Sequence, residues 1–249
     1  MLITHDFVML NYPKTGTTFT RAVLKQLYGD AIEEILGRNP MNPHSVPDSP
    51  HLAVSQIPAR YADLPIVSIH RNVFDRYVSL WQFKWYTHDH PSVQEAARAL
   101  YPSFPDLSLE QYLGMANRVQ KARLLASLGF EPTDRIGFQS VQFIVFYARD
   151  PKTCLRDAIA NPDLDLRRYV PEIHFLRQSM LRQDLTAFLA STPVGPAATD
   201  VIRTFPELNV TRTGEDAGWR HFWSDALMAE YTAKEAPVLN FTRQLGLDD

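Results

Sequence analysis

The chain has 249 residues and a formal net charge of −3; 45% of its residues are hydrophobic and 21% are charged. This length and composition fit a globular protein with a sizeable core, and the net negative charge argues against a non-specific nucleic-acid binder. Cys154 is the only cysteine, which excludes an intrachain disulfide and a metal site held by cysteine thiolates.

No targeting or membrane segment is predicted. The first residues, MLITHDFVML, lack the basic stretch and long apolar run of a signal peptide, and no later run reaches membrane-spanning length. We therefore expect a soluble, cytoplasmic protein. There is no repeat and no low-complexity linker, so residues 1–249 are predicted to form a single domain, whose oligomeric state stays open.

Short apolar runs alternate with amphipathic stretches along the first half of the chain. The apolar spacing predicts a strand at 7–10, a helix from 17 that stops at Gly29, a strand at 64–69 and an aromatic-rich helix from 72 to about 86. Residues 37–50 contain four prolines, which predicts an irregular loop.

The second half is predicted to be mainly helical, with one strand. Helices are expected from Ser108 to 116 and on to 128, over 151–161, over 178–191 and over 224–235, and the apolar run VQFIVFYA predicts a strand at 141–148. Strands that alternate with helices favour an α/β fold, in which helices flank both faces of a central parallel sheet.

The segment YPKTGTTF, residues 12–19, joins the first predicted strand to the first predicted helix. A tight turn at Gly16 before a helix presents free backbone N–H groups at the positive end of the helix dipole, which suits a phosphate-like anion. Lys14 adds a full charge, and the neighbouring threonines add hydroxyl donors. Lys14 precedes Gly16, the reverse of the order in a nucleotide-triphosphatase loop, which disfavours an ATPase or GTPase.

A second segment, RNVFDRYVSLW, begins with Arg71 directly after the strand at 64–69. The carboxyl ends of strands in open α/β sheets are where ligands bind. Ser79 follows eight residues later, about two helical turns on, so it can face the same edge of a pocket. Arg149 also follows a predicted strand, but Asp157 stands where a serine would be needed, and we reject it as an anion site.

Together, YPKTGTTF and RNVFDRYVS resemble the 5′-phosphosulfate loop and the 3′-phosphate element of sulfotransferases that use 3′-phosphoadenosine-5′-phosphosulfate (PAPS). RTGEDAGW, residues 212–219, resembles a third element of that family, with Thr213 in place of the usual lysine. The resemblance implies a single P-loop-like domain. It covers these segments only, so the acceptor site is not inherited.

The resemblance also implies roles for individual residues. The 5′-phosphosulfate would be held by Lys14, Thr15, Gly16, Thr17 and Thr18, and the 3′-phosphate by Arg71, Ser79, Arg212, Thr213 and Gly214. Phe19 stands in the place of a family tryptophan that stacks on adenine, and Tyr147 resembles a family tyrosine near the nucleobase.

Transfer of a sulfuryl group needs a base to take the proton of the acceptor, and histidine suits this role. HLAVSQIP, which begins at His51, resembles the family segment that begins with the catalytic histidine. His44, in the same proline-rich region, is the alternative histidine. Asp48 is the nearest candidate for an acidic base.

The sequence therefore predicts in-line transfer of a sulfuryl group from PAPS to a hydroxyl or amine, with PAP as product and no metal. Lys14 would neutralise the leaving phosphate, and His51 would act as the base. The acceptor is expected to be a small molecule or a carbohydrate. Residues 175–185 resemble a helix of the carbohydrate branch of the family. A nucleotide kinase and a non-catalytic nucleotide-binding protein are the alternatives.

Overall fold

A mixed five-stranded sheet forms the centre of a computed structural model of the protein, which describes residues 1–42, 47–206, 208 and 218–247. The strand order is β3-β1-β2-β4-β5, with β1 at Leu2–Ile3, β2 at Val8–Met9, β3 at Glu33–Glu34, β4 at Ile66–His70 and β5 at His174–Arg177. β2, β4 and β5 are parallel, whereas β1 is antiparallel to both β2 and β3. The prediction of a parallel sheet is thus wrong for the edge formed by β1 and β3. β1 and β2 are consecutive in sequence, so a short turn can connect them as antiparallel neighbours without a crossover helix.

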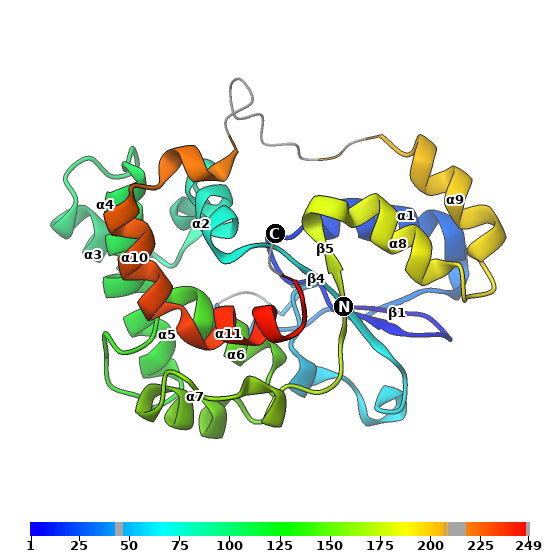
Figure 1. The fold of residues 1–249 in the computed structure, drawn as a ribbon, viewed down its shortest axis with the longest axis horizontal. Helices are drawn as coiled ribbons and strands as arrows, with labels where there is room; N and C mark the ends of the chain where they lie inside the picture. Colours follow the sequence, from blue (N-terminus) through cyan, green and yellow to red (C-terminus); the bar gives the residue numbers. More distant parts are fainter. Residues whose placement is uncertain (43–46, 207, 209–217, 248–249) are drawn as a thin grey trace.

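Helices cover both faces of this sheet (Figure 1). They are α1 (Thr17–Tyr28), α2 (Val73–Gln82), α3 (Pro91–Leu100), α4 (Leu109–Met115), α5 (Lys121–Ser127), α6 (Phe138–Tyr147), α7 (Pro151–Ala160), α8 (Leu181–Leu189), α9 (Gly195–Thr204), α10 (Asp225–Lys234) and α11 (Ala236–Gln244). In Figure 1, α1, α8 and α9 lie on one side of the sheet, and the remaining helices lie on the other. Among the described residues, no helix has the length and apolarity needed to cross a bilayer.

Alternation along the strands explains this division into layers. Phe7 and Met9 pack into a core with α1, α8 and α9, while Val8 and Leu10 pack into a larger core on the opposite face. Successive side chains of a strand point to opposite faces of the sheet. A strand in which every residue is apolar therefore places side chains in a core on each face, which requires helices on both faces. The sheet is therefore buried between two sets of helices.

Several predicted helix boundaries are confirmed. The side chain of Asn72 accepts hydrogen bonds from the first turn of α2, and Ser108 forms a capping box with Gln111 at the start of α4. α1 ends at Gly29, which has a positive φ of 53°. In each case the residue that begins or ends the helix acts locally, so the signal is readable in the sequence.

The predicted strand at 141–148 is wrong, because these residues belong to helix α6. Nine of the ten residues of α6 are buried, all except Gln142. A helix that is buried all round shows no amphipathic period, and its apolar run then looks like a buried strand. The expected helix over 178–191 is confirmed only from Leu181 onward; residues 174–177, immediately before it, form strand β5.

Glu235, at the junction of α10 and α11, is fully buried and holds the N-terminus of α6. Its carboxylate accepts hydrogen bonds from the backbone N–H groups of Gln139 (3.1 Å) and Ser140 (2.7 Å), from the hydroxyl of Ser140 (2.7 Å) and from that of Tyr77 (2.5 Å). Burial raises the pKa of Glu235 above its ordinary value, while these donors oppose the shift. Glu235 therefore ties α2, α6 and α10 together.

We expect Glu235→Ala to reduce the free energy of unfolding by about 3–5 kcal/mol, because its four donors would be left without an acceptor inside the core. Urea denaturation of the two proteins measures this loss. The control is Glu230→Ala on the same helix, whose exposed pair with Lys234 is worth about 0.5 kcal/mol. Equal losses in the two variants would contradict a structural role for the buried carboxylate.

Candidate functional site

A cleft of about 310 Å³ lies where β2 and β4 end and helices α1 and α2 begin. The predicted site residues that line it are Lys14, Gly16, Thr17, Thr18, Phe19, His51, Arg71 and Ser79, together with Phe83, Trp85 and Gln178. Two motifs that are separate in the sequence, and a histidine between them, thus meet at the carboxyl edge of two parallel strands, where α/β sheets bind ligands.

The loop between β2 and α1 is anchored through its carbonyl groups. The five consecutive carbonyls of residues 10–14 each accept a hydrogen bond from a side chain. In order, the partners are Ser68 (3.2 Å), the Nδ1 of His51 (2.6 Å), Thr15 (2.8 Å), the Nε of Arg76 (3.0 Å) and the Nη1 of Arg71 (3.1 Å). The loop conformation is therefore fixed by the protein itself, before any ligand is bound.

The N-terminus of α1 opens into the cleft without a side-chain cap. Gly16 is the N-cap residue with a φ of 96°, and it offers no side chain to the first turn. The first N–H groups of a helix have no partner within the helix, and they carry the positive end of its dipole. Thr17 and Thr18 line the same place. Thr15 differs, because its side chain is buried and bonded to the loop.

Lys14 brings a cation to this helix terminus. Its Nζ lies 3.6 Å from the centroid of the Phe83 ring, and its backbone has a φ of 65°. Burial, helped by the nearby charges of Arg71 and Arg76, lowers the pKa of Lys14 to about 8. A bound anion would oppose this shift, so the ammonium group is suited to an anionic ligand.

Arg71 and Ser79 form the second cluster of donors in the cleft. The Nε and Nη2 of Arg71 bind the carboxylate of Asp75 at 2.7 and 2.9 Å, an ion pair between residues one helical turn apart. Ser79 is 1% exposed, and within the described part of the chain its hydroxyl has no hydrogen-bond partner. A buried hydroxyl that lines a cleft and lacks a partner can donate to a polar group that enters the cleft. Sequence reasoning missed Asp75, although its spacing of four from Arg71 was a usable signal.

The ring of His51 is held by a hydrogen bond to the backbone of the loop. A carbonyl oxygen only accepts, so the contact with Asn11 places the hydrogen of the neutral ring on Nδ1 and the free lone pair on Nε2. Its ring is 6.4 Å from that of Trp85, edge to face, and burial lowers the pKa of His51 below its ordinary value. Asp48 is exposed and is not among the residues that line the cleft. His44 lies outside the described residues.

The two aromatic residues expected near a nucleobase differ in position. Phe19 lines the cleft and an adjoining recess of about 440 Å³, but the guanidinium of Arg182 lies 4.6 Å from its ring centroid. Tyr147 is 1% exposed in the core, and its hydroxyl is 2.8 Å from that of Ser68. It does not line the cleft, since α6 directs this side chain toward the sheet. The expectation for Tyr147 is therefore corrected.

Three further predicted residues, Arg212, Thr213 and Gly214, lie outside the described residues. The rejected candidate Arg149 is exposed after α6, away from the residues that line the cleft. Across the described ranges, no group of three or more histidine, cysteine, aspartate or glutamate side chains is placed to hold a metal ion.

Comparisons with known proteins add no relative. No protein-family model matches the chain, and no curated protein and no solved structure matches it significantly. The function is therefore inferred from the geometry of the cleft and from the chemistry of its side chains.

We expect inorganic sulfate to stabilise the protein more at pH 7 than at pH 9, at constant ionic strength. Lys14, with a pKa of about 8, is about nine-tenths charged at the lower pH and about one-tenth charged at the higher one. The difference in melting temperature with and without sulfate measures the effect. Lys14→Met should abolish the pH dependence. Lys152→Met, which alters an exposed lysine at the start of α7, should preserve it; a loss in both variants would contradict the assignment.

Proposed function

We propose that this protein is a sulfotransferase with a P-loop-like domain, which transfers a sulfuryl group from PAPS to a hydroxyl or amine of a small-molecule or carbohydrate acceptor and releases PAP. The observation that carries the proposal is the meeting of two separate donor clusters and one oriented histidine in a single cleft. A ligand with anionic groups at two ends would engage both clusters.

The first cluster suits the 5′-phosphosulfate. The residues of this cluster line the cleft around the start of α1, and they are the uncapped turn at Gly16, Thr17, Thr18 and Lys14. During transfer, negative charge grows on the phosphate oxygen that leaves. Fixed donors aimed at developing charge are often worth several kcal/mol of barrier. The anchored carbonyls of the loop keep these donors in place without reorganisation.

The second cluster suits the 3′-phosphate. Arg71 supplies a guanidinium beside the loop, and the unpartnered hydroxyl of Ser79 supplies a buried donor. These groups act at a distance from the reacting sulfur, and they fix the register of the donor molecule. Arg212 and Gly214, which the resemblance assigns to the same phosphate, would add to this cluster.

His51 serves as the general base. The acceptor oxygen or nitrogen attacks sulfur in line with the leaving phosphate oxygen, the new bond to sulfur forms as the sulfur–oxygen bond to the 5′-phosphate breaks, and the acceptor proton passes to Nε2 of His51. The hydrogen bond from Nδ1 to Asn11 holds the ring and stabilises the imidazolium that forms.

A nucleotide kinase is the principal alternative, because it would also bind phosphates at a strand–helix turn. Such enzymes use Mg²⁺ and a glycine–lysine–serine or –threonine sequence in the loop. Here Lys14 precedes Gly16, so the loop has a lysine before the glycine and none directly after it. A non-catalytic nucleotide-binding protein is the second alternative. Such a protein needs no base, so it would not explain why the His51 ring is held with its Nε2 lone pair free.

PAP at one hundred times its Kd should raise the melting temperature by about 5–10 °C. A ligand that binds only the folded protein at this concentration increases the free energy of unfolding by about 2.7 kcal/mol. AMP, which lacks the 3′-phosphate, should give a much smaller shift. Arg71→Ala and Ser79→Ala should each weaken PAP about tenfold to a hundredfold, because each removes a hydrogen bond to a charged group.

Arg149→Ala is the matched control for Arg71→Ala, because Arg149 also follows an element rich in apolar residues but lies away from the cleft. It should bind PAP normally. The affinity for AMP should be unchanged in Ser79→Ala. A stabilisation by ATP with Mg²⁺ and none by PAP would replace the sulfotransferase proposal with the kinase.

His51→Gln should lower kcat about a hundredfold or more and leave PAP affinity unchanged, because a general base acts on the acceptor and not on the donor. In the unaltered protein, activity should fall as the pH drops through the pKa of His51, which lies below the value of about 6.5 of a free histidine. His5→Gln, at an exposed site near the N-terminus, is the control. Full activity of His51→Gln would exclude it as the base.

A further inference from the structure

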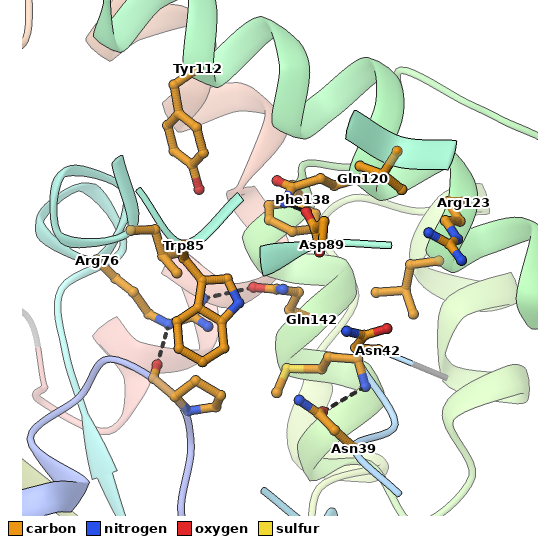
Figure 2. A pocket seen from close by; sticks show the side chains of 15 residues that line it. Asn39, Asn42, Arg76, Trp85, Asp89, Tyr112, Gln120, Arg123, Phe138 and Gln142 are labelled. Atoms are coloured by element: carbon orange, nitrogen blue, oxygen red, sulfur yellow. Dashed lines mark hydrogen bonds between the residues drawn. The ribbon is translucent and has the colours of Figure 1, made fainter. Parts of the chain in front are cut away.

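A second, smaller cavity of about 50 Å³ adjoins the cleft (Figure 2). Pro13 and Trp85 line both spaces, and the Trp85 ring is the one that packs against His51. In the proposed reaction, a cavity that shares Trp85 with the surroundings of His51 lies on the side of the acceptor.

Arg76, on α2, contributes a buried charge to this cavity. It is 2% exposed, and its guanidinium donates to the carbonyl of Pro13 at 3.0 Å and to the side-chain oxygens of Gln139 and Gln142, the latter at 3.0 Å. One face lies 4.1 Å from the ring centroid of Tyr12. All of these partners are neutral, and no carboxylate of the described residues is within ion-pair distance. A buried cation without a counter-ion is costly unless a ligand supplies the opposite charge.

Arg123, on α5, brings a second guanidinium to the cavity wall (Figure 2). Its charge acts on the carboxylate of Asp89 in the same lining, but the two do not form an ion pair, and within the described part of the chain Arg123 makes no side-chain hydrogen bond. The one carboxylate in the lining is Asp89, which binds the side-chain amide of Gln120. Burial raises the pKa of Asp89, whereas the hydrogen bond from Gln120 and the nearby charge of Arg123 oppose the shift. The lining thus holds two guanidinium groups and one carboxylate. The lining therefore carries an excess of positive charge.

The size of the cavity limits the group that enters it. A space of about 50 Å³ holds about four water molecules on the usual scale of 10–15 Å³ each. This is room for a carboxylate and the carbon that bears it, and not for a whole sugar or aromatic ring. The body of an acceptor would remain in the larger cleft, against Trp85.

We propose that this cavity binds the carboxylate of the acceptor, so that Arg76 and Arg123 select hydroxy acids or sugar acids and hold their hydroxyl group at His51. The assignment as an acceptor subsite rests on the proposed sulfotransferase function. Arg76 has an additional positioning role, because it also anchors the loop carbonyl of Pro13. Arg123 is free of such a role, and it is therefore the better residue to alter.

Acetate and acetamide test the cavity directly, because both fit it and only one is charged. We expect acetate, at constant ionic strength, to shift the indole N–H signal of Trp85 saturably in proton–nitrogen spectra, with Trp85→Phe to assign the signal. Acetamide should leave it unmoved. Arg123→Gln should weaken acetate about tenfold, whereas Arg118→Gln, an exposed neighbour, should not. Absence of a saturable acetate shift, or an equal response to acetamide, would overturn the proposal.

Turnover of matched acceptors tests the role of the cavity. Glucuronate should be sulfated with a higher kcat/KM than glucuronamide, as should 4-hydroxybenzoate relative to 4-hydroxybenzamide, and Arg123→Gln should remove the preference by raising KM for the acid. Equal use of acids and amides would overturn the proposal. PAP binding without acetate binding rejects the carboxylate subsite alone, and acetate binding without PAP binding rejects the sulfotransferase function and the acceptor role with it.

Discussion

The loop between β2 and α1 turns its carbonyl groups toward the protein, and the cleft depends on this constraint. Arg71 and Arg76, both near the start of α2, bind two successive carbonyls, those of Lys14 and Pro13. With the carbonyls engaged in this way, the uncapped N–H groups at the start of α1 stay available to a ligand. Because the loop is already ordered by these contacts, a ligand that binds there would lose little binding free energy to ordering the loop.

The same contacts distribute positive charge in a definite pattern. Arg71 shares its guanidinium between Asp75 and the loop, so the charge it offers to a ligand is already partly balanced. Arg76 has only neutral partners, and burial, together with the nearby charges of these two arginines, lowers the pKa of Lys14. Lys14 and Arg71 in the cleft and Arg76 in the adjoining cavity therefore differ in how far their charges are already balanced. Under the proposed function, this difference would separate the phosphate sites from the carboxylate site.

The sequence predicted those features of the site that depend on residues close together in the chain. The turn at Gly16, the helix start at Asn72 and the spacing from Arg71 to Ser79 are each readable within one segment, and the structure brings them into one cleft. The roles of these residues toward a ligand stay predictions. Helix α6 was misread because burial on every face removes the amphipathic period, and the tyrosine that it carries was misplaced with it. The two glutamine partners of Arg76 could not be predicted, since they come from the distant helix α6.

The distances along the chain have a kinetic consequence. Lys14 and Arg71 are 57 residues apart, Pro13 and Arg76 are 63 apart, and Gln139 and Glu235 are 96 apart. Such contacts form only after large loops have closed, which slows folding. Ser68 of β4 and the arginines at the start of α2 supply three of the five anchors, so we expect the loop to order after these elements have docked. Substitutions in this loop should therefore speed unfolding and leave the folding rate almost unchanged.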